Sequence, residues 1–334
     1  MIELPEIPKV KSYIDDMTQE QKVLAKCVKN SELTEGEEST LIECIEFYKL
    51  VFPILKSIDL SRLNDSQVQF LKSYLNKVFS FEITVTNPVH FEVLFRVSIV
   101  QDSFLEKGKV RNPKYLTFPP LEIVKSKGVY NRANSCNKTV FYASFYENVA
   151  LRETKPKAGD KVIISNWHNI TGNPFNSYAI TNSNVNNQGV STATQSLQLL
   201  KGKVHPLFAE LMNIALTFLA SEFVKEIEFK SKKKYEYLFS AYFSDKILSL
   251  SNTINPETNI DFIIYPSVAW KHIHDNLAIH PDSVRKLKLI QVKEFDVIST
   301  NYDVELEPKE NPVQLNFIRN SDWVEKEIIV WDDD

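Results

Sequence analysis

Glycine is scarce in this chain, with seven residues among 334, where an average composition would supply about 7%. The two closest glycine pairs, Gly159 with Gly172 and Gly189 with Gly202, are each thirteen positions apart. No glycine-rich dinucleotide fingerprint and no P-loop can be present, because both motifs need glycines within a few residues of one another. A nucleotide bound here would need arginine side chains or a helix N-terminus to hold its phosphates.

Cysteine and an excess of charge are also lacking. The three cysteines, Cys27, Cys44 and Cys136, form no C-x-x-C pair and cannot build a disulfide framework, so we predict a reducing, cytoplasmic setting. The first residues show no basic segment followed by an apolar one, so no secretory signal is expected. The formal net charge of −4 predicts no electrostatic footprint for nucleic acid.

Long apolar runs free of charge are missing too. The most apolar window, residues 207–224, carries Glu210 and Glu222. Two carboxylates are costly in hydrocarbon, so the window predicts a buried helix and no membrane partner. His272 and His274 have no third ligand at a recognisable spacing, so no metal site is predicted.

The first 80 residues predict helices. Apolar residues recur with a helical period between residues 37 and 52, and a second such pattern follows Asn64, a suitable N-cap. Pro53 is expected to end or kink the first helix. Because nothing in this region concentrates chemistry, we predict a helical accessory domain over residues 1–80, with a packing or partner-binding role.

From residue 81 the pattern changes to short β-type runs. Strands are predicted at 81–86, 91–100, 162–164, 178–181, 261–267, 287–300, 313–319 and 327–331. Helices are predicted at 205–228 and 234–250, and an asparagine-rich stretch at about 165–200 predicts a long polar loop or insertion. The acidic residues 332–334 are expected to fray. The chain is therefore predicted to be α+β, with a second domain over 81–334.

Arg96 lies in the middle of an apolar strand pattern. An unpaired buried charge is very costly, so this arginine must be paired or must line a cavity. An edge strand with Arg96 facing water is an equally good interpretation on local grounds.

An ordered set of motifs spans residues 90–300 or so. Arg96 is followed by a turn with Tyr130, Arg132 and Asn134, by the strand run Phe141-Tyr142-Ala143-Ser144, and by Glu153. Tyr265-Pro266-Ser267 and Asp275-Asn276-Leu277-Ala278 complete the set. In order and spacing it resembles the RES family, which is named for arginine, glutamate and serine. These are NAD-degrading proteins with an ADP-ribosyltransferase-like fold, best known as toxins of bacterial toxin–antitoxin pairs.

The resemblance implies a core of two small packed β-sheets with flanking helices, preceded here by the helical region. It implies catalytic roles for Glu153, Arg96 and Ser267. It implies NAD-binding roles for Arg96, Arg132, Tyr142, Tyr130 and Asn134.

These residue types suit the chemistry. Loss of nicotinamide from NAD develops positive charge on the ribose, which a carboxylate such as Glu153 stabilises. Arginine binds pyrophosphate with its planar fork, and a tyrosine ring can stack on nicotinamide. The resemblance thus predicts an NAD glycohydrolase or phosphorylase, acting as a growth-arresting toxin or defence effector. NAD is the substrate, no metal is needed, an antitoxin protein is a candidate partner, and self-association is left open.

Three alternatives remain open at this stage. The chain could transfer ADP-ribose to a macromolecule, with the polar loop and the helical region as recognition surfaces. It could bind NAD without cleaving it. Arg96 and Glu153 could instead form a purely structural buried ion pair, with Ser267 capping a turn.

Overall fold

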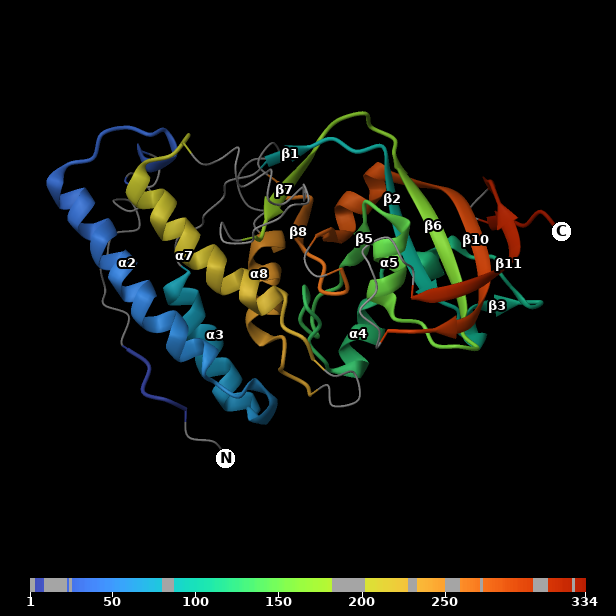
Figure 1. Ribbon diagram of the computed structural model, residues 1–334, viewed down its shortest axis with the longest axis horizontal. Coiled ribbons are helices and arrows are strands. Elements are labelled where there is room, and N and C mark those ends of the chain that lie inside the picture. Colours follow the sequence, from blue (N-terminus) through green and yellow to red (C-terminus); the bar gives the residue numbers. More distant parts are fainter. Residues whose placement is uncertain are drawn as a thin grey trace.

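The computed structural model describes the chain at residues 4–8, 23, 26–79, 87–181, 202–227, 233–249, 259–270, 273–302, 312–325 and 328–334. Helices lie at one end and a large sheet at the other (Figure 1). The α-helices are α2 (Glu35–Lys56), α3 (Asp65–Val78), α4 (Leu121–Lys127), α5 (Glu147–Thr154), α7 (Pro206–Phe223) and α8 (Leu238–Ser249). The molecule is therefore of mixed α and β structure, as predicted.

The two helices of the first 80 residues begin at capping boxes. Thr34 and Glu37 exchange side chain–backbone hydrogen bonds at the start of α2, and Asn64 and Gln67 do the same at the start of α3. Such reciprocal bonds satisfy backbone N–H groups that the first helical turn leaves unpaired. Pro53 was expected to end or kink the first helix, and it does not end it, because α2 continues to Lys56. Its last turn carries Leu55, which is fully buried and anchors the continuation.

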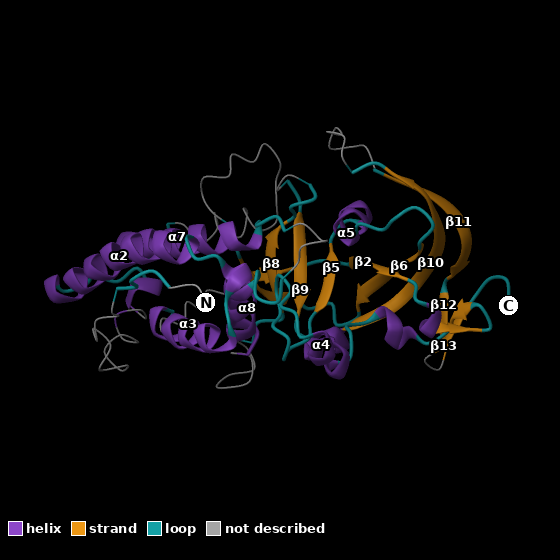
Figure 2. Cartoon of the chain, turned by 90° about the horizontal axis from the view of Figure 1, so that it is seen from below, coloured by secondary structure: helices purple, strands orange, loops and turns teal. Residues whose placement is uncertain are grey.

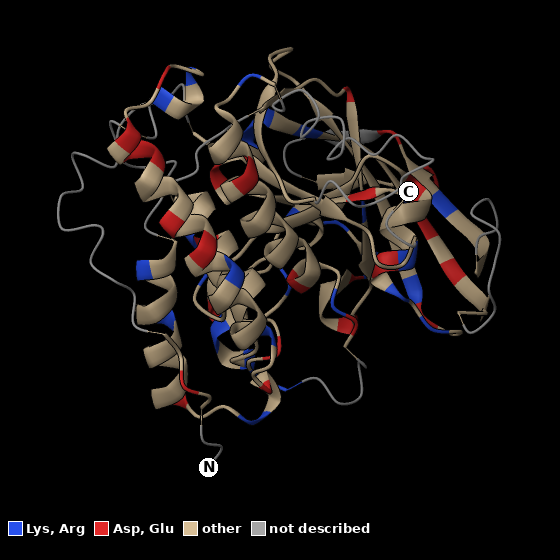
Figure 3. Cartoon of the chain, turned by 60° about the vertical axis from the view of Figure 1, so that its left-hand side comes forward, with Lys and Arg blue, Asp and Glu red and all other residues tan. Residues whose placement is uncertain are grey.

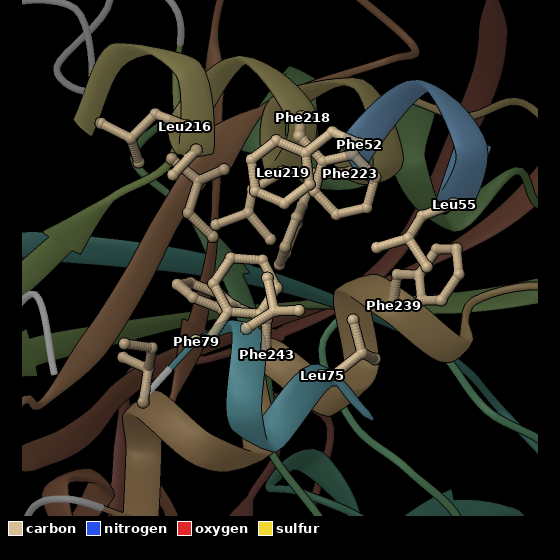
Figure 4. Close-up of a cluster of buried hydrophobic side chains, with 14 of the residues drawn as sticks. Phe52, Leu55, Leu75, Phe79, Leu216, Phe218, Leu219, Phe223, Phe239 and Phe243 are labelled. Atoms are coloured by element: carbon tan, nitrogen blue, oxygen red, sulfur yellow. The ribbon is translucent and has the colours of Figure 1, made fainter. Parts of the chain in front are cut away.

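Helices α2, α3, α7 and α8 share one hydrophobic core. Phe52 of α2 stacks on Phe218 of α7, with ring centroids 4.5 Å apart and planes at 5°. Phe79, directly after α3, packs edge-on against Phe243 of α8 at 5.6 Å. Figure 4 shows side chains from all four helices pointing toward one another. Because this core joins residues before 80 to residues after 200, packing does not follow the boundary drawn at residue 80.

Helix α7 corresponds to the most apolar window of the chain. It is long and apolar enough to span a bilayer by length and composition, but 56% of the window is buried inside the protein. In Figures 1 and 2 it lies alongside α2. This burial agrees with the buried helix that was predicted for this window.

Among the described residues, the main sheet has nine strands in the order β1-β7-β8-β9-β5-β2-β6-β10-β11. They are β1 (Asn87–Val89), β7 (Phe175–Ala179), β8 (Phe262–Pro266), β9 (Asp275–Ile279), β5 (Phe141–Ser144), β2 (Val93–Ile99), β6 (Lys161–Asn169), β10 (Leu287–Thr300) and β11 (Val313–Ser321). Only β7 and β8 run parallel; the other pairs are antiparallel. Helices α5 and α4 lie on opposite sides of this sheet (Figure 2).

The sheet nearly divides between β5 and β2. These strands share one register pair, Phe95 with Ser144, whereas β2 pairs with β6 over seven residues from Val93 to Ile99. We call this narrow contact the seam. The expected two separate packed sheets are therefore replaced by one sheet with two halves, five strands on one side of the seam and four on the other.

Other strand predictions need correction. Residues 165–177 were expected to be part of a loop, but they contain the end of β6 and the first residues of β7. The strand predicted at 178–181 overlaps the end of β7. Asparagine and serine interrupt the apolar runs of these strands, so their sequences do not show a clear β pattern. The predicted strand at 81–86 and residues 182–200 of the predicted polar loop lie outside the described residues.

Two short hairpins complete the sheet end of the molecule, formed by β3 (Leu105–Glu106) with β4 (Lys109–Val110) and by β12 (Trp323–Glu325) with β13 (Ile328–Val330). The acidic residues that follow β13 do not fray as expected. Asp334 accepts hydrogen bonds from Arg111 at 2.6 and 2.8 Å, and Lys109 donates to Asp333 at 2.7 Å. Basic and acidic residues are interspersed along the helices and along the strands (Figure 3).

Candidate active site

A cavity of about 500 Å³ opens at the seam. It is bordered by β2, β5, β8 and β9, by the end of α5, and by the segments around α7 and α8. Its lining consists of Arg96, Val97, Asn131, Arg132, Tyr142, Ala143, Ala150, Glu153, Thr154, Lys155, Glu226, Ile227, Tyr237, Tyr265, Val268, Ala269 and Asn276. A seam suits such a site because strands that do not pair leave room between them for a ligand.

Helix α5 presents Glu153 to this cavity. Ala150, Glu153 and Thr154 all line it, and their spacing places them on one helical face. Val149 and Leu151 are buried and anchor the helix. The small side chain of Ala150, one turn before Glu153, leaves space in front of the carboxylate.

The Glu153 carboxylate is held by two donors from the turn after β8. The Ser267 hydroxyl donates to Oε1 at 2.5 Å, and the Ala269 backbone N–H donates to the same oxygen at 3.2 Å. Glu153 forms no other hydrogen bond or ion pair within the described part of the chain. One carboxylate oxygen is therefore fixed in place, and the other accepts no hydrogen bond from a described residue.

Ser267 is itself fully buried and rigidly placed. Its backbone N–H donates to the carbonyl of His274 at 2.7 Å, directly after the buried strand β8. Glu153 and Ser267 were predicted as site residues, and they are in direct contact. This contact joins α5 to the end of β8 across 114 residues of sequence.

Arg96 lies on β2 at the seam. Its Nη1 donates to the carbonyl of Tyr142 on β5 at 2.8 Å, so its side chain spans the two sheet halves where backbone pairing is nearly absent. Its guanidinium lies 5.2 Å from the centroid of the Phe141 ring, and its buried Nε has no hydrogen-bond partner. Burial lowers the pKa of Arg96 to about 10, which still leaves it charged at neutral pH.

Arg96 therefore lines a cavity and does not face bulk solvent from an edge strand, because β2 lies between β5 and β6. Among the described residues it forms no ion pair with Glu153 or with any other carboxylate. The structural alternative of a buried Arg96–Glu153 pair is thus not observed. A charged group with unfilled hydrogen-bonding capacity in a cavity is suited to bind an anion.

Arg132 lines the cavity but is already engaged with protein groups. Its Nη1 donates to the carbonyl of Phe223 at the end of α7, and its Nη2 donates to the Tyr237 hydroxyl at 3.2 Å. Its guanidinium also lies 5.1 Å from the centroid of the Tyr237 ring. Arg132 therefore braces the junction between α7 and α8 at the cavity wall.

Tyr142 also lines the cavity, and its hydroxyl is fully used. The hydroxyl donates to Oδ1 of Asn134 at 2.9 Å and accepts from the Ala133 N–H at 3.0 Å. Burial raises the pKa of Tyr142. Asn134 is buried behind this ring, where it holds the phenol, and is not among the cavity's lining residues. The structure thus places Asn134 in contact with a cavity residue.

Tyr130 does not line the cavity either. Its ring is buried and packs edge-on against Tyr235 at 5.3 Å, and its N–H donates to the carbonyl of Lys234 at 3.0 Å. Tyr130 therefore ties the turn to the start of α8.

Several lining residues were not predicted as site residues. They are Tyr237, Lys155, Glu226 and Asn131 among others, and also Tyr265 and Asn276, which were named only as parts of motifs. Burial raises the pKa values of Tyr237 and Tyr265, and the negative charge of Glu153 contributes to both shifts. Tyr265 directly precedes the Pro266-Ser267 motif, which was a usable signal. No local pattern singles out Tyr237, because only the fold brings α8 to the seam.

Arg152 lies next to Glu153 in α5. It is half-buried, and its guanidinium lies 4.5 Å from the centroid of the Trp270 ring. Burial lowers the pKa of Arg152. Its packing on the turn that contains Ala269 supports the donors that hold Glu153.

No group of three or more His, Cys, Asp or Glu side chains suited to a metal ion occurs among the described residues. His274 packs against the rings of Tyr146 and Trp270, at 4.8 and 5.2 Å. His272 lies outside the described residues.

No family model, no curated protein and no solved structure matches the chain. The resemblance to the RES family therefore stays a hypothesis that rests on the motifs themselves.

Proposed function

We propose that this protein is an enzyme that cleaves NAD at the bond between nicotinamide and ribose, with water or phosphate as acceptor. The observation that carries the proposal is the Glu153 carboxylate, fixed through one oxygen by Ser267 and Ala269, in the same cavity as the incompletely bonded Arg96. The site thus offers a positioned negative charge and a positive charge that are not paired with each other.

Glu153 supplies the chemistry in this proposal. As the C1′–N bond breaks, its electron pair moves to the nicotinamide nitrogen, and positive charge develops on the ribose. The free Glu153 oxygen stabilises that charge, and an acceptor oxygen then bonds to C1′ and loses its proton. A carboxylate already oriented by two donors needs no reorganisation during this step, which is the condition for strong electrostatic catalysis.

Arg96 and the aromatic wall position the substrate. The guanidinium stays charged at neutral pH and has unused donors for a phosphate or a carboxamide oxygen. The rings of Tyr142, Tyr237 and Tyr265 line the same cavity and provide surfaces on which nicotinamide can stack. A volume of about 500 Å³ is within the usual range of about 300–1,000 Å³ for small-molecule sites.

The proposal includes the fold and the biological role. The two halves of the sheet on either side of the seam would correspond to the two sheets of an ADP-ribosyltransferase-like core. The protein would deplete NAD in the cytoplasm as a growth-arresting toxin or defence effector, and a neutralising protein would be its partner.

Release of nicotinamide from NAD by the purified protein tests the proposal. We expect Glu153→Gln to lower the rate by about 100-fold or more without loss of folding, because glutamine keeps an acceptor for Ser267 and Ala269. Glu147→Gln is the matched control, since Glu147 lies on the same helix but is not a lining residue. Its activity should equal that of the wild type.

Arg96→Met provides a second, independent variant. It removes the cation but keeps an apolar side chain of similar length, and we expect turnover to fall by about 10-fold or more. Full turnover in Glu153→Gln, or no nicotinamide release by the wild type, would contradict the proposal. In the first case label from adenine-tagged NAD on protein or nucleic acid would indicate a transferase with another catalytic group. In the second, NAD binding by calorimetry would indicate a binding module.

A further inference from the structure

Three cationic side chains line the cavity: Arg96, Arg132 and Lys155. Two of them are held in fixed positions by the protein, although the Nε of Arg96 has no hydrogen-bond partner. Arg132 is held by the Phe223 carbonyl and by the hydroxyl and ring of Tyr237. Arg96 bridges the seam to the Tyr142 carbonyl. Neither can move far toward a ligand without losing the contacts that shape the cavity.

Lys155 differs from both arginines. It is exposed, and its side chain forms no hydrogen bond, ion pair or cation–π contact with any described residue. Glu226, the other exposed charge in the lining, forms no ion pair with it in the described part of the chain. Lys155 is therefore the cavity cation that can reach a ligand without breaking a contact.

The backbone at Lys155 is unusual as well. It is the C-cap of α5 and adopts a left-handed conformation, with φ +48° and ψ +54°, where glycine or asparagine is normally favoured. In this chain a lysine adopts this conformation directly after Glu153 and Thr154. Residues held in such sparsely populated conformations cluster at functional sites.

We propose that Lys155 binds the phosphate groups of the substrate, a role that was expected for Arg96 and secondarily for Arg132. The inference rests on the proposed function. In NAD the reacting C1′ and the first phosphate, on C5′, belong to the same ribose. Glu153 and Lys155 are two positions apart at the end of one helix. Glu153 would stabilise the positive charge that develops on the ribose, and Lys155 would bind the phosphate on C5′ of the same ribose. The site then selects a nicotinamide nucleotide over an uncharged nucleoside.

Substrates that differ only in phosphate content test this role. The variant is Lys155→Asn, because asparagine is neutral and tolerates the left-handed conformation. We expect KM to rise about tenfold for NAD and for nicotinamide mononucleotide, with kcat largely retained, and no change for nicotinamide riboside. Lys155→Arg should restore the affinity for NAD. Lys157→Asn, on an exposed residue outside the lining, is the matched control.

Binding of ADP, followed by calorimetry, separates this inference from the proposed function, because ADP has two phosphates but no bond to cleave. If the wild type releases no nicotinamide yet binds ADP about tenfold more tightly than Lys155→Asn, the NAD-cleaving function fails and the phosphate role stands. The role of Lys155 would be overturned if the two proteins bound ADP equally, or if the wild type did not bind ADP. It would also be overturned if Lys155→Asn differed from the wild type in melting temperature and not in ADP binding. An equal loss for nicotinamide riboside and NAD would overturn it as well.

Discussion

The helical end and the seam use their side chains in opposite ways. In the helical end, Phe52, Phe79 and Phe218 stack on one another, and few polar groups interrupt the core. At the seam, a buried nitrogen of Arg96 has no hydrogen-bond partner, and Glu153 accepts hydrogen bonds from described residues through only one of its two oxygens. The helical end is held together by apolar packing, whereas the seam contains polar atoms that have no hydrogen-bond partner among the described residues.

This difference indicates where stability and chemistry reside. Apolar contacts in a dense core stabilise the fold and present nothing for a ligand to bind. Buried polar groups that lack hydrogen-bond partners destabilise a fold. Such groups are explained where a ligand supplies the missing hydrogen bonds. The two regions meet where the ends of α7 and α8 contact Arg132, so the helical end also supports one wall of the cavity. Variants in each region test whether stability and activity depend on different residues.

The largest effect on stability is expected in the helical end. Phe218→Ala removes a buried ring that stacks on Phe52 and also packs near Phe79 and Phe239, and should lower the free energy of unfolding by about 3–5 kcal/mol. Urea denaturation measures this loss. Phe70→Ala in α3 is the control, because Phe70 is 52% exposed.

NAD cleavage per folded molecule should be unchanged in Phe218→Ala. A loss of stability no larger than that of Phe70→Ala would break the comparison, since the core would then not depend on its stacked rings.

A smaller effect is expected for Tyr142→Phe at the seam. Without the hydroxyl, the Ala133 N–H and the Asn134 Oδ1 lose their partner, so the free energy of unfolding should fall by about 1–3 kcal/mol. The surface residue Tyr115 supplies the control, as Tyr115→Phe should leave stability unchanged.

The pH dependence of this loss has a defined sign. Burial raises the pKa of Tyr142 above the ordinary value of about 10. The neutral phenol therefore contributes its stability below pH 10 or so, and the contribution is lost as the pH rises toward the folded-state pKa. The gap between wild type and Tyr142→Phe should narrow above about pH 10. A gap that widens there would show that the seam tyrosine is not buried in its neutral form.

The smallest effect is expected outside both regions, at Asp334. Hydrogen bonds from Arg111, and then from Lys109, hold the pKa of this carboxyl well below its usual range. Its contribution is therefore present above the ordinary aspartate pKa and is lost as the pH falls below it. Because the contacts are exposed, Asp334→Asn should lower the melting temperature by at most a few degrees at pH 7.

The difference between Asp334→Asn and the wild type should disappear in acid and shrink in high salt. Asp102→Asn, on an exposed residue without these partners, is the control. A melting temperature in Asp334→Asn as low as in Phe218→Ala would mean that this exposed cluster, and not the helical core, dominates stability.

Much of the helical end could be predicted from the sequence. The periodic apolar residues of α2 and α3, and the capping pairs at Thr34 and Asn64, are local signals that act within one or two turns. Strands β2, β5, β8 and β10 were also located by their apolar runs. Strands β6 and β7 were partly missed, because asparagine and serine break the β pattern in them.

The sequence by itself determined which residue types were available: scarce glycine, an arginine inside an apolar strand, and Glu153 and Ser267 in short ordered motifs. Only the tertiary structure decided their contacts. Ser267 reaches Glu153, Arg132 turns to Phe223 and Tyr237, and Lys155 is left unengaged at the cavity. The reason is physical: helix caps and periodic faces depend on neighbours in sequence. The seam instead depends on β2 and β5, where Arg96 meets Tyr142 across 46 residues, and Ser267 reaches Glu153 across 114 residues.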